Sequence, residues 1–361
     1  MAPDPARFAA LLCDYCLEVQ PGQQVVVRST TLAAPLLLAL QEELLAREAW
    51  PLVRAELPGA DEVFWQHARD AHLDGFPAAE LAEAKATDAS IGIQAPANTR
   101  ALAHVDAGRM ARAARARAPV REAALGRRWC LTLWPTAAGA QQAGMGTTEF
   151  AAFVRRALFL DRGDAGMAWH ELSHFQARLI ERLQTASELR IEAEGTDLRL
   201  RVDGRVWVNS DGKRNMPSGE VFTAPVDGTA EGRIRYTIPS SPGGVAVEGI
   251  TLRFEAGRVV EAHAERGEEY LRTTLATDDG ASRLGEIGIG TNFGIDRPVG
   301  MILLDEKIGG TVHLAVGRSY EETGGTNESA VHWDMICDLR GGGRLSADGA
   351  PVVQDGRFLD E

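Results

Sequence analysis

The character of the sequence changes at about residue 188, and this change constrains the fold more than any other feature. Before it, short β-branched runs alternate with longer segments of helical pattern; after it, short strand-like runs follow one another between Gly, Asp, Asn and Pro. Alternating strands and helices predict a parallel sheet, whereas closely spaced strands predict a β-rich region. We therefore expect an α/β domain with a mostly parallel sheet over residues 1–188, and a β-rich α+β domain over residues 189–361.

The first half contains the predicted strands and helices of that α/β domain. Either Thr147 or Thr148 can cap the helix that begins there, and Glu149 falls in its first turn. No G-x-G-x-x-G follows a predicted strand, so a dinucleotide site has no support. The predicted strands cover 23–30, 50–57, 88–96 and 129–136, and the predicted helices cover 32–48, 107–118, 147–160 and 167–183.

Charge and hydropathy exclude several classes of partner. The net charge of -13 argues against nucleic acid and anionic membranes, because both favour clusters of Lys and Arg. No apolar run reaches the length of a membrane span, and the N-terminus lacks the pattern of a signal peptide. We expect a cytoplasmic protein.

Four cysteines are present, and two of them form the C-x-x-C of "LLCDYCLEV". Such a pair can be a redox motif or half of a zinc site. No second C-x-x-C completes a zinc site, so we favour a buried helix face on which Cys13 and Cys16 are small apolar residues. This interpretation fits a reducing compartment.

The segment "WHELSHF" contains H-E-x-x-H, the signature of zinc metalloproteases. On a helix, His170 and His174 would share one face and Glu171 could activate a water molecule. The downstream H-x-x-G-x-x-H extension is missing, and the two histidines lie off the apolar stripe of the helix. We interpret them as histidines on the outer face of a helix that links the two domains.

A second constellation lies in the β-rich half, in "VHWDMICDL". Successive side chains of a strand point to opposite faces, so Trp333 and Met335 would enter the core. His332 and Asp334 would then project together from the other face, roughly 7 Å apart along the strand. In "GTVHLAVGRSY", His313 lies likewise opposite an apolar face.

Two glutamates occur in glycine-rich apolar runs, Glu220 in "MPSGEVFTAP" and Glu286 in "RLGEIGIGTNFG". A carboxylate there is costly to bury unless it is paired or binds a metal. Two Glu, one Asp and two His form a mixed oxygen and nitrogen ligand set that suits Zn, Co or Mn. The set exceeds what one catalytic zinc needs, which indicates a dinuclear centre.

The motifs "NMPSGEVFTAP", "LGEIGIGTN", "DEKIGGTVHLAVGRSY" and "GGTNESAVHWDMICDL" resemble those of the M29 metalloaminopeptidases, the thermophilic aminopeptidase family. The resemblance runs over nearly the whole chain. It departs at Gly139, where relatives usually carry a Tyr, which could alter the domain interface or cleft. The resemblance implies the following metal set: Glu220, Glu286, His313, Tyr320, His332 and Asp334.

What the family implies is a two-domain homodimer that binds two divalent metal ions per chain and releases N-terminal residues from peptides. Glu220 or Glu286 would take a proton from the attacking water, and the sequence does not choose between them. Tyr320 would ligate a metal or steady the tetrahedral oxyanion. The H-E-x-x-H is not part of the family's metal site.

Two other functions stay open at this point. Ring-cleaving dioxygenases of dihydroxypyridine distantly resemble the family and use one iron with a His/His/Asp site. The presence of Glu220, Glu286 and Tyr320 argues against that activity. A non-catalytic dimeric scaffold is the other alternative, and the intact ligand set argues against it.

Overall fold

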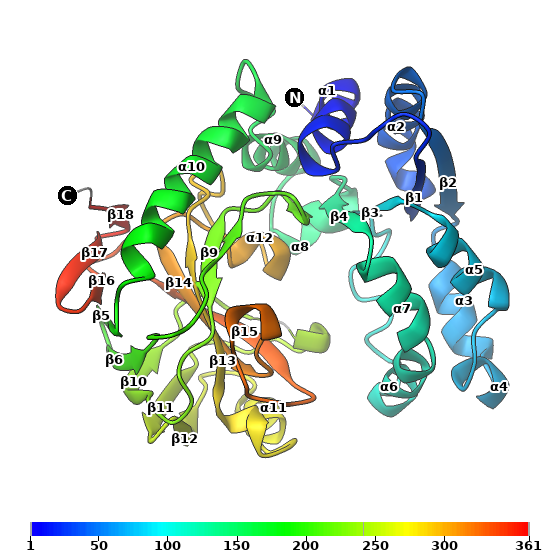
Figure 1. Ribbon diagram of the computed structural model, residues 1–361. Coiled ribbons are helices and arrows are strands. Elements are labelled where there is room, and N and C mark those ends of the chain that lie inside the picture. The colour runs from blue at the N-terminus through cyan, green and yellow to red at the C-terminus, as the bar shows by residue number, and fades with distance from the viewer. Residues whose placement is uncertain (1, 241, 360–361) are drawn as a thin grey trace. The chain divides into compact units, whose positions relative to one another are not determined.

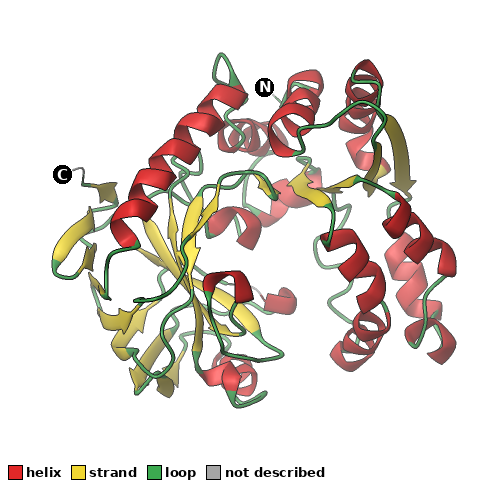
Figure 2. Cartoon of the chain, in the orientation of Figure 1, coloured by secondary structure: helices red, strands yellow, loops and turns green. Residues whose placement is uncertain are grey.

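The computed structural model describes residues 2–240 and 242–359, and the chain divides into two compact units. The first unit comprises 1–168 with 212–217, and the second comprises 169–211 with 218–361. Figure 1 colours the chain by residue number, and Figure 2 shows that strands dominate the second unit. The predicted domain limits, 1–188 and 189–361, stay a prediction.

The first unit contains the parallel sheet that the alternating pattern predicts. Its strand order is β2-β1-β3-β4-β8, and every described pairing within it is parallel. The last strand comes from the returning segment 212–217, which the sequence did not indicate. The strands are β1 (Gln24–Thr30), β2 (Trp50–Glu56), β3 (Ala89–Gln94), β4 (Arg128–Leu133) and β8 (Asn215–Met216).

Helices connect these strands. Gly146 is the N-cap residue of α9, so the prediction of Thr147 or Thr148 as the cap is wrong; Thr147 is the first helical residue, and its side chain therefore does not cap. The helices are α1 (Pro5–Leu11), α2 (Ala34–Ala46), α3 (Ala60–His67), α4 (Asp70–Leu73), α5 (Ala78–Ala86), α6 (Ala107–Ala116), α7 (Ala118–Leu125), α8 (Ala137–Gln142) and α9 (Thr147–Ala157), with short turns η1 (Leu12–Cys16) and η2 (Thr31–Ala33).

The C-x-x-C lies in a buried helical turn, as predicted. Cys13 is fully buried and Cys16 nearly so, and both are free thiols. Their turn is a π-helix that continues α1. Burial raises the pKa of Cys13 to about 12, which keeps its thiol protonated and unreactive. Helix α10 (Ala165–Leu183) then leads from the first unit into the second.

The second unit contains two antiparallel sheets. The larger has the order β12-β11-β10-β6-β5-β16-β17-β18, and the smaller has the order β15-β14-β13-β9-β7. The elements are β5 (Glu188–Ala193), β6 (Thr196–Arg201), β7 (Val208–Ser210), β9 (Glu220–Thr223), β10 (Glu231–Arg235), β11 (Thr251–Glu255), β12 (Arg258–His263), β13 (Leu284–Gly290), β14 (Thr311–Gly317), β15 (His332–Asp338), β16 (Arg344–Ala347), β17 (Ala350–Gln354), β18 (Arg357–Phe358), α11 (Glu268–Leu275), α12 (Ile302–Asp305), η3 (Pro242–Gly244), η4 (Gly280–Ser282) and η5 (Glu321–Thr323).

One apolar core joins the two sheets of the second unit. The larger sheet contributes Ile191 and Leu198, and the smaller contributes Ile289 and Leu314, all fully buried in one cluster. Each such side chain stabilises the fold by about 1.5–3 kcal/mol relative to an exposed one. Among the described helices, none is both long and apolar enough to cross a bilayer.

Replacement of a core residue of the smaller sheet should lower the stability of the second unit. Ile289→Ala leaves a cavity at a fully buried position and should cost about 2–5 kcal/mol. The matched change Ile302→Ala, at a position that is 47% exposed, should change stability by less than about 0.5 kcal/mol. Urea unfolding followed by tryptophan fluorescence measures both, and equal effects would contradict this core assignment.

Candidate metal site

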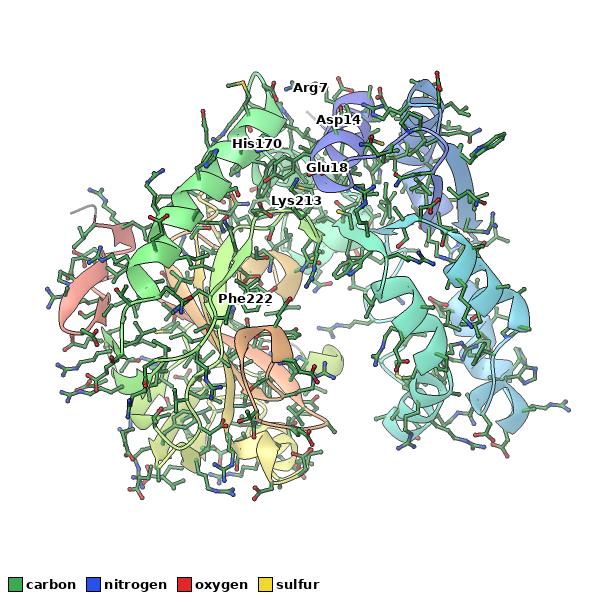
Figure 3. All side chains as sticks on the ribbon, in the orientation of Figure 1. Arg7, Asp14, Glu18, His170, Lys213 and Phe222 are labelled. Carbon is green, nitrogen blue, oxygen red and sulfur yellow. The ribbon has the colours of Figure 1, made fainter. Side chains whose placement is uncertain are left out.

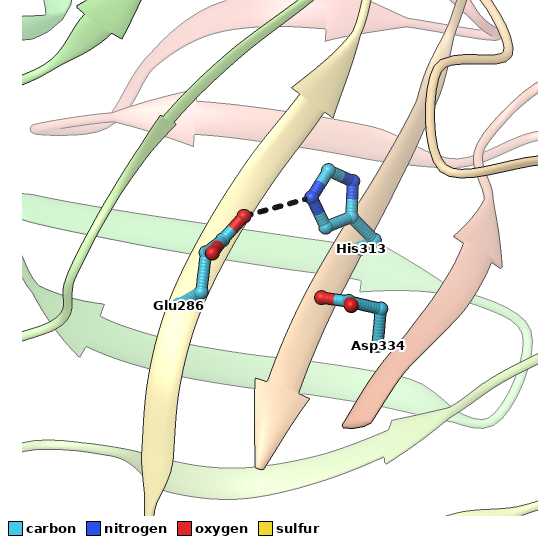
Figure 4. A group of neighbouring side chains, drawn as sticks. All are labelled: Glu286, His313 and Asp334. Atoms are coloured by element: carbon cyan, nitrogen blue, oxygen red, sulfur yellow. Dashed lines mark hydrogen bonds and ion pairs between the residues drawn. The ribbon is translucent and has the colours of Figure 1, made fainter. Parts of the chain in front are cut away.

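Strand alternation places the candidate site on the face of the smaller sheet opposite the core. Trp333 and Met335 are buried in the core cluster, as the sequence predicts. His332 and Asp334, from the same strand β15, therefore project from the opposite face. In the neighbouring strands β13 and β14, alternate residues such as Ile287 and Leu314 join the same core, and Glu286 and His313 share the face of Asp334 (Figure 4).

The register across the three strands brings these side chains together. Ala315 in β14 pairs with Glu286 on one side and with Asp334 on the other. One row further along, His313 pairs with Gly288. Directly opposed residues of an antiparallel pair point to the same face, so the two carboxylates flank a methyl group. Between the longer side chains, this face of the sheet carries only small residues.

Gly288 is required by the position of the His313 ring. A Cβ atom at residue 288 would lie 2.1 Å from Nε2 of His313, closer than any real contact. The imidazole therefore lies directly against the glycine backbone. This contact explains one glycine of the "GEIGIG" run, which the sequence alone presents only as an apolar, glycine-rich strand.

The charged atoms of the cluster lie within reach of one another. Nε2 of His313 lies 3.2 Å from Oε1 of Glu286, the interaction drawn in Figure 4. Ligand atoms of Glu286, His313 and Asp334 all lie within 4.8 Å of one another. Nε2 of His332 lies 3.8 Å from Oε2 of Glu286 and 3.5 Å from Oδ2 of Asp334. Glu286 therefore presents one oxygen to each histidine.

Glu220 enters the site from strand β9. It pairs with Gly290 across the sheet, and its Oε2 lies 3.5 Å from Nε2 of His313. Its other oxygen, Oε1, accepts a hydrogen bond from Nζ of Lys307 at 2.9 Å. Its backbone carbonyl accepts a hydrogen bond from the fully buried amide of Gln176 at 2.8 Å. Both the side chain and the main chain of Glu220 are thus held in place.

Tyr320 lies at the open side of the site, beside His332. The two ring centroids are 5.0 Å apart, and the ring of Phe222 lies 5.9 Å from that of Tyr320. Figure 3 labels Phe222 on strand β9. Tyr320 is 39% exposed, the most exposed of the six predicted residues. Nδ1 of His332 donates to the carbonyl oxygen of Arg318 at 2.7 Å, which leaves Nε2 directed at the carboxylates.

The pKa values reflect a surplus of buried negative charge. Burial raises the pKa of Glu286, and the nearby charge of Asp334 adds to the effect. Burial also opposes the charged form of His313, but its hydrogen bond to Glu286 and the charge of Glu220 raise the pKa of His313 to about 9. For Glu220, the Lys307 ammonium and His313 outweigh burial and lower the pKa.

The donor set fits a divalent cation. Four buried polar atoms of the site make no hydrogen bond within the described part of the chain. Buried polar groups are rarely left without a partner, and carboxylate oxygens with imidazole nitrogens are ligands for Zn, Co or Mn. No cysteine contributes to the cluster, so a thiolate site does not fit. The four atoms are Glu220 Oε2, Glu286 Oε2, His313 Nδ1 and Asp334 Oδ1.

The H-E-x-x-H residues lie elsewhere on the second unit. His170, Glu171 and His174 are exposed on α10, and Figure 3 labels His170 there. They belong to no group of three or more metal-ligating side chains among the described residues. The contribution of this helix to the site is Gln176, two residues beyond the motif and on its buried side.

Lys307 and Glu306 are the charged residues of the site that sequence reasoning missed. Lys307 is fully buried, and its Nζ contacts carboxylate oxygens of both Glu220 and Glu306. A signal was present in the composition: the chain has only three lysines, and this one directly follows two acidic residues within "DEKIGGTVH". A lysine is rarely buried without counter-charges, so the acidic residues that precede Lys307 in the sequence were candidate partners for its side chain.

Gly288→Ala should displace His313 and weaken metal binding. The added methyl group overlaps the imidazole, so we expect a loss of at least about tenfold in metal affinity. The control Gly341→Ala adds the same atom in the same unit, where nothing lies within 4 Å. Isothermal titration with Zn²⁺ measures both variants. Unchanged affinity of Gly288→Ala would exclude His313 from the metal set.

Comparison with known proteins places the chain in a family. The chain matches the thermophilic metalloprotease family M29 over residues 3–358. It is 31% identical to aminopeptidase 2 of Geobacillus stearothermophilus over 97% of this chain and 94% of that protein. The structure of wild-type AmpT from Thermus thermophilus superposes with a TM-score of 0.85 at 27% identity, covering 99% of each chain.

A second solved structure shares the fold at much lower identity. The 2,5-dihydroxypyridine dioxygenase of Pseudomonas putida KT2440 superposes with a TM-score of 0.59 at 16% identity, covering 99% of this chain and 97% of that one. At this identity the likeness shows the fold alone. It leaves the chemistry to be argued from the site residues.

Proposed function

The chain belongs to the M29 metalloprotease family, and from this membership we propose that it is an aminopeptidase that holds two divalent metal ions over strands β13–β15. The enzyme class, a metal-dependent exopeptidase, is that of its curated relatives. The two-ion centre rests on one observation: Glu286 presents one oxygen to His313 and the other to His332. The proposed ligands are Glu220, Glu286, His313, His332 and Asp334, and Tyr320 lies beside them with a separate role.

The geometry divides the ligands into two groups. Glu220 and His313 lie on one side of Glu286, and His332 and Asp334 lie on the other. Two oxygens and one nitrogen on each side resemble the three protein ligands of a catalytic metal. Bound there, Zn, Co or Mn would supply Lewis acidity that polarises the scissile carbonyl and lowers the pKa of water.

Of the two glutamates that the sequence left open, we assign Glu286 as the general base. Glu220 is paired with the buried cation of Lys307 through Oε1, which disfavours its taking up a proton. No lysine or arginine of the described chain pairs with Glu286. The carboxylate of Glu286 would therefore receive the proton of the attacking water and pass it to the leaving amine.

Tyr320 is assigned to the tetrahedral oxyanion. Tyr320 is 39% exposed and lies beside the ring of His332, so its side chain can reach a bound peptide. Its hydroxyl would donate a hydrogen bond to the oxygen on which negative charge develops. The sequence also allowed Tyr320 to be a metal ligand. Removal of its hydroxyl separates the two roles, because metal binding would weaken only if the hydroxyl is a ligand.

The free α-amine of the substrate would bind near a metal or an acidic group of this site, which fits an exopeptidase. We further propose, from the family resemblance, that the enzyme is a cytoplasmic homodimer, which sedimentation of the purified protein would check.

Glu286→Gln should abolish hydrolysis while the fold is retained. The amide keeps the shape of the side chain but cannot accept a proton at neutral pH, so kcat for leucine p-nitroanilide should fall by at least about 10²-fold. Circular dichroism and urea unfolding verify the fold. Activity within a few fold of wild type would refute the assignment of Glu286.

The histidines of the H-E-x-x-H provide the matched control for the metal site. His170→Ala with His174→Ala removes two exposed imidazoles and should leave bound metal and activity unchanged. His332→Ala removes one imidazole of the proposed centre and should lose both. Metal content by plasma mass spectrometry, read beside the peptidase assay, decides between the two motifs. Loss of metal in the double variant would restore the H-E-x-x-H interpretation.

Metal analysis also separates the peptidase from the dioxygenase whose fold is shared. The peptidase predicts two ions of Zn, Co or Mn per chain, and removal of these ions by a chelator should abolish peptidase activity. Re-addition should restore it. One iron per chain, with oxygen uptake on a dihydroxypyridine, would support the other activity.

A further inference from the structure

Lys307 is a fully buried cation beside the candidate metal site. The other two lysines, Lys85 and Lys213, are exposed or half-buried. Burial of an ammonium group in a water-poor interior is costly unless charged partners surround it. A positive charge next to a cation site also repels the ion that the site is built to hold. Its presence there needs a compensating role.

The partners of Lys307 are two carboxylates. Nζ donates to Oε1 of Glu220 at 2.9 Å and also contacts Oε1 of Glu306. The side chain of Glu220 is 7% exposed and that of Glu306 15%. Lys307 therefore lies between two carboxylates that would otherwise repel each other across a buried space.

The main chain of Lys307 is held on both sides. Its N–H donates to the carbonyl of Leu304 at the end of α12, and its carbonyl accepts from the N–H of Asn292. The side chain of Asn292 in turn donates to the carbonyl of Ser218, close to the start of β9. The ammonium group is thus fixed relative to the strand that carries Glu220.

The two oxygens of Glu220 have different surroundings. Oε1 is occupied by Lys307, whereas Oε2 is buried, makes no hydrogen bond and lies 3.5 Å from Nε2 of His313. A carboxylate held in this way offers a single oxygen in a fixed direction. Such support from outside the ligand set orients the ligands of metal sites in general.

We infer that Lys307 is a positioning residue that fixes Glu220 as a one-oxygen metal ligand and separates it from Glu306. The inference rests on the proposed metal centre and deepens it. An ammonium group is a compact point charge with three donors, which suits the contacts of Lys307 with two carboxylates.

Lys307→Met tests this role by removal of the charge while most of the side-chain volume is kept. Glu220 and Glu306 then become unshielded like charges, and Glu220 moves away from His313. We expect metal affinity to fall by about 10–100-fold, the usual effect of losing such a support. The absorption spectrum of the Co²⁺-loaded protein should change in intensity, because one ligand is displaced. Lys213→Met, which removes a lysine paired with Glu18 in the first unit, is the control and should change neither property.

The double variant Lys307→Met with Glu306→Gln separates positioning from mere structural support. It removes the cation and the repelling carboxylate together, so Glu220 can return and metal affinity should recover at least partly. Glu306→Gln alone keeps the contact of Lys307 with Glu220 and should bind metal as wild type does. If the double variant binds metal no better than Lys307→Met, or if Lys307→Met binds metal normally, the inference is wrong.

Failure of the inference is distinguishable from failure of the proposed function. A wild-type protein that binds no divalent ion would contradict the two-ion centre itself. A wild type that binds two ions, together with a Lys307→Met variant of equal affinity and an equal Co²⁺ spectrum, would overturn only the role of Lys307. Thermal unfolding of the metal-free proteins identifies a variant that does not fold, and the double variant, with its net charge unchanged, then carries the test.

Discussion

Several carboxylates are buried or nearly buried on one face of the small antiparallel sheet, Glu220 and Glu286 among them. Such burial is unfavourable unless cations compensate it. The apolar side chains on the other face of the same strands join a core shared with the larger sheet, and this core supplies the stability that the charged face lacks. One internal cation, Lys307, and the proposed metal ions offset the remaining negative charge.

The small residues of the three strands make this arrangement sterically possible. Gly288 gives the His313 ring a place against the backbone, and Ala315 separates Glu286 from Asp334 without filling the space between them. The grouping of these side chains thus follows from the register of the sheet. A fold that other enzymes share receives its chemistry from the few residues placed on such a face.

Strand alternation made much of this predictable from sequence. The alternation of apolar and polar residues in "VHWDMICDL" predicts one core face and one opposite face, and the burial of Trp333 and Met335 in the core confirms this prediction. The parallel sheet of the first unit followed from alternating elements. Five of the six predicted site residues were singled out from strand alternation and glycine-rich context, and the family resemblance added Tyr320. The contact of Glu220 with His313 could not be predicted locally, because the two residues belong to strands distant in sequence.

What could not be predicted depends on contacts between distant segments. The pairing of β8 with β4 joins residues about a quarter of the chain apart, and no periodic signal marks a strand of two residues. The hydrogen bond from Gln176 on α10 to Glu220 likewise joins segments that are distant in sequence. The neighbouring H-E-x-x-H directs attention to other residues of the same helix. Helix α10 thus contains the sequence motif of one kind of metal site, while its Gln176 supports a different candidate site.

Anomalous diffraction from crystals of the Zn- or Co-loaded protein can show whether two ions bind over strands β13–β15. Two peaks are expected in each chain, on opposite sides of Glu286, each within about 2.0–2.2 Å of a carboxylate oxygen or imidazole nitrogen. One of the two should lie between Glu220 and His313, and the other between His332 and Asp334. A single peak, or a peak at His170 and His174, would be incompatible with a two-ion centre at Glu286.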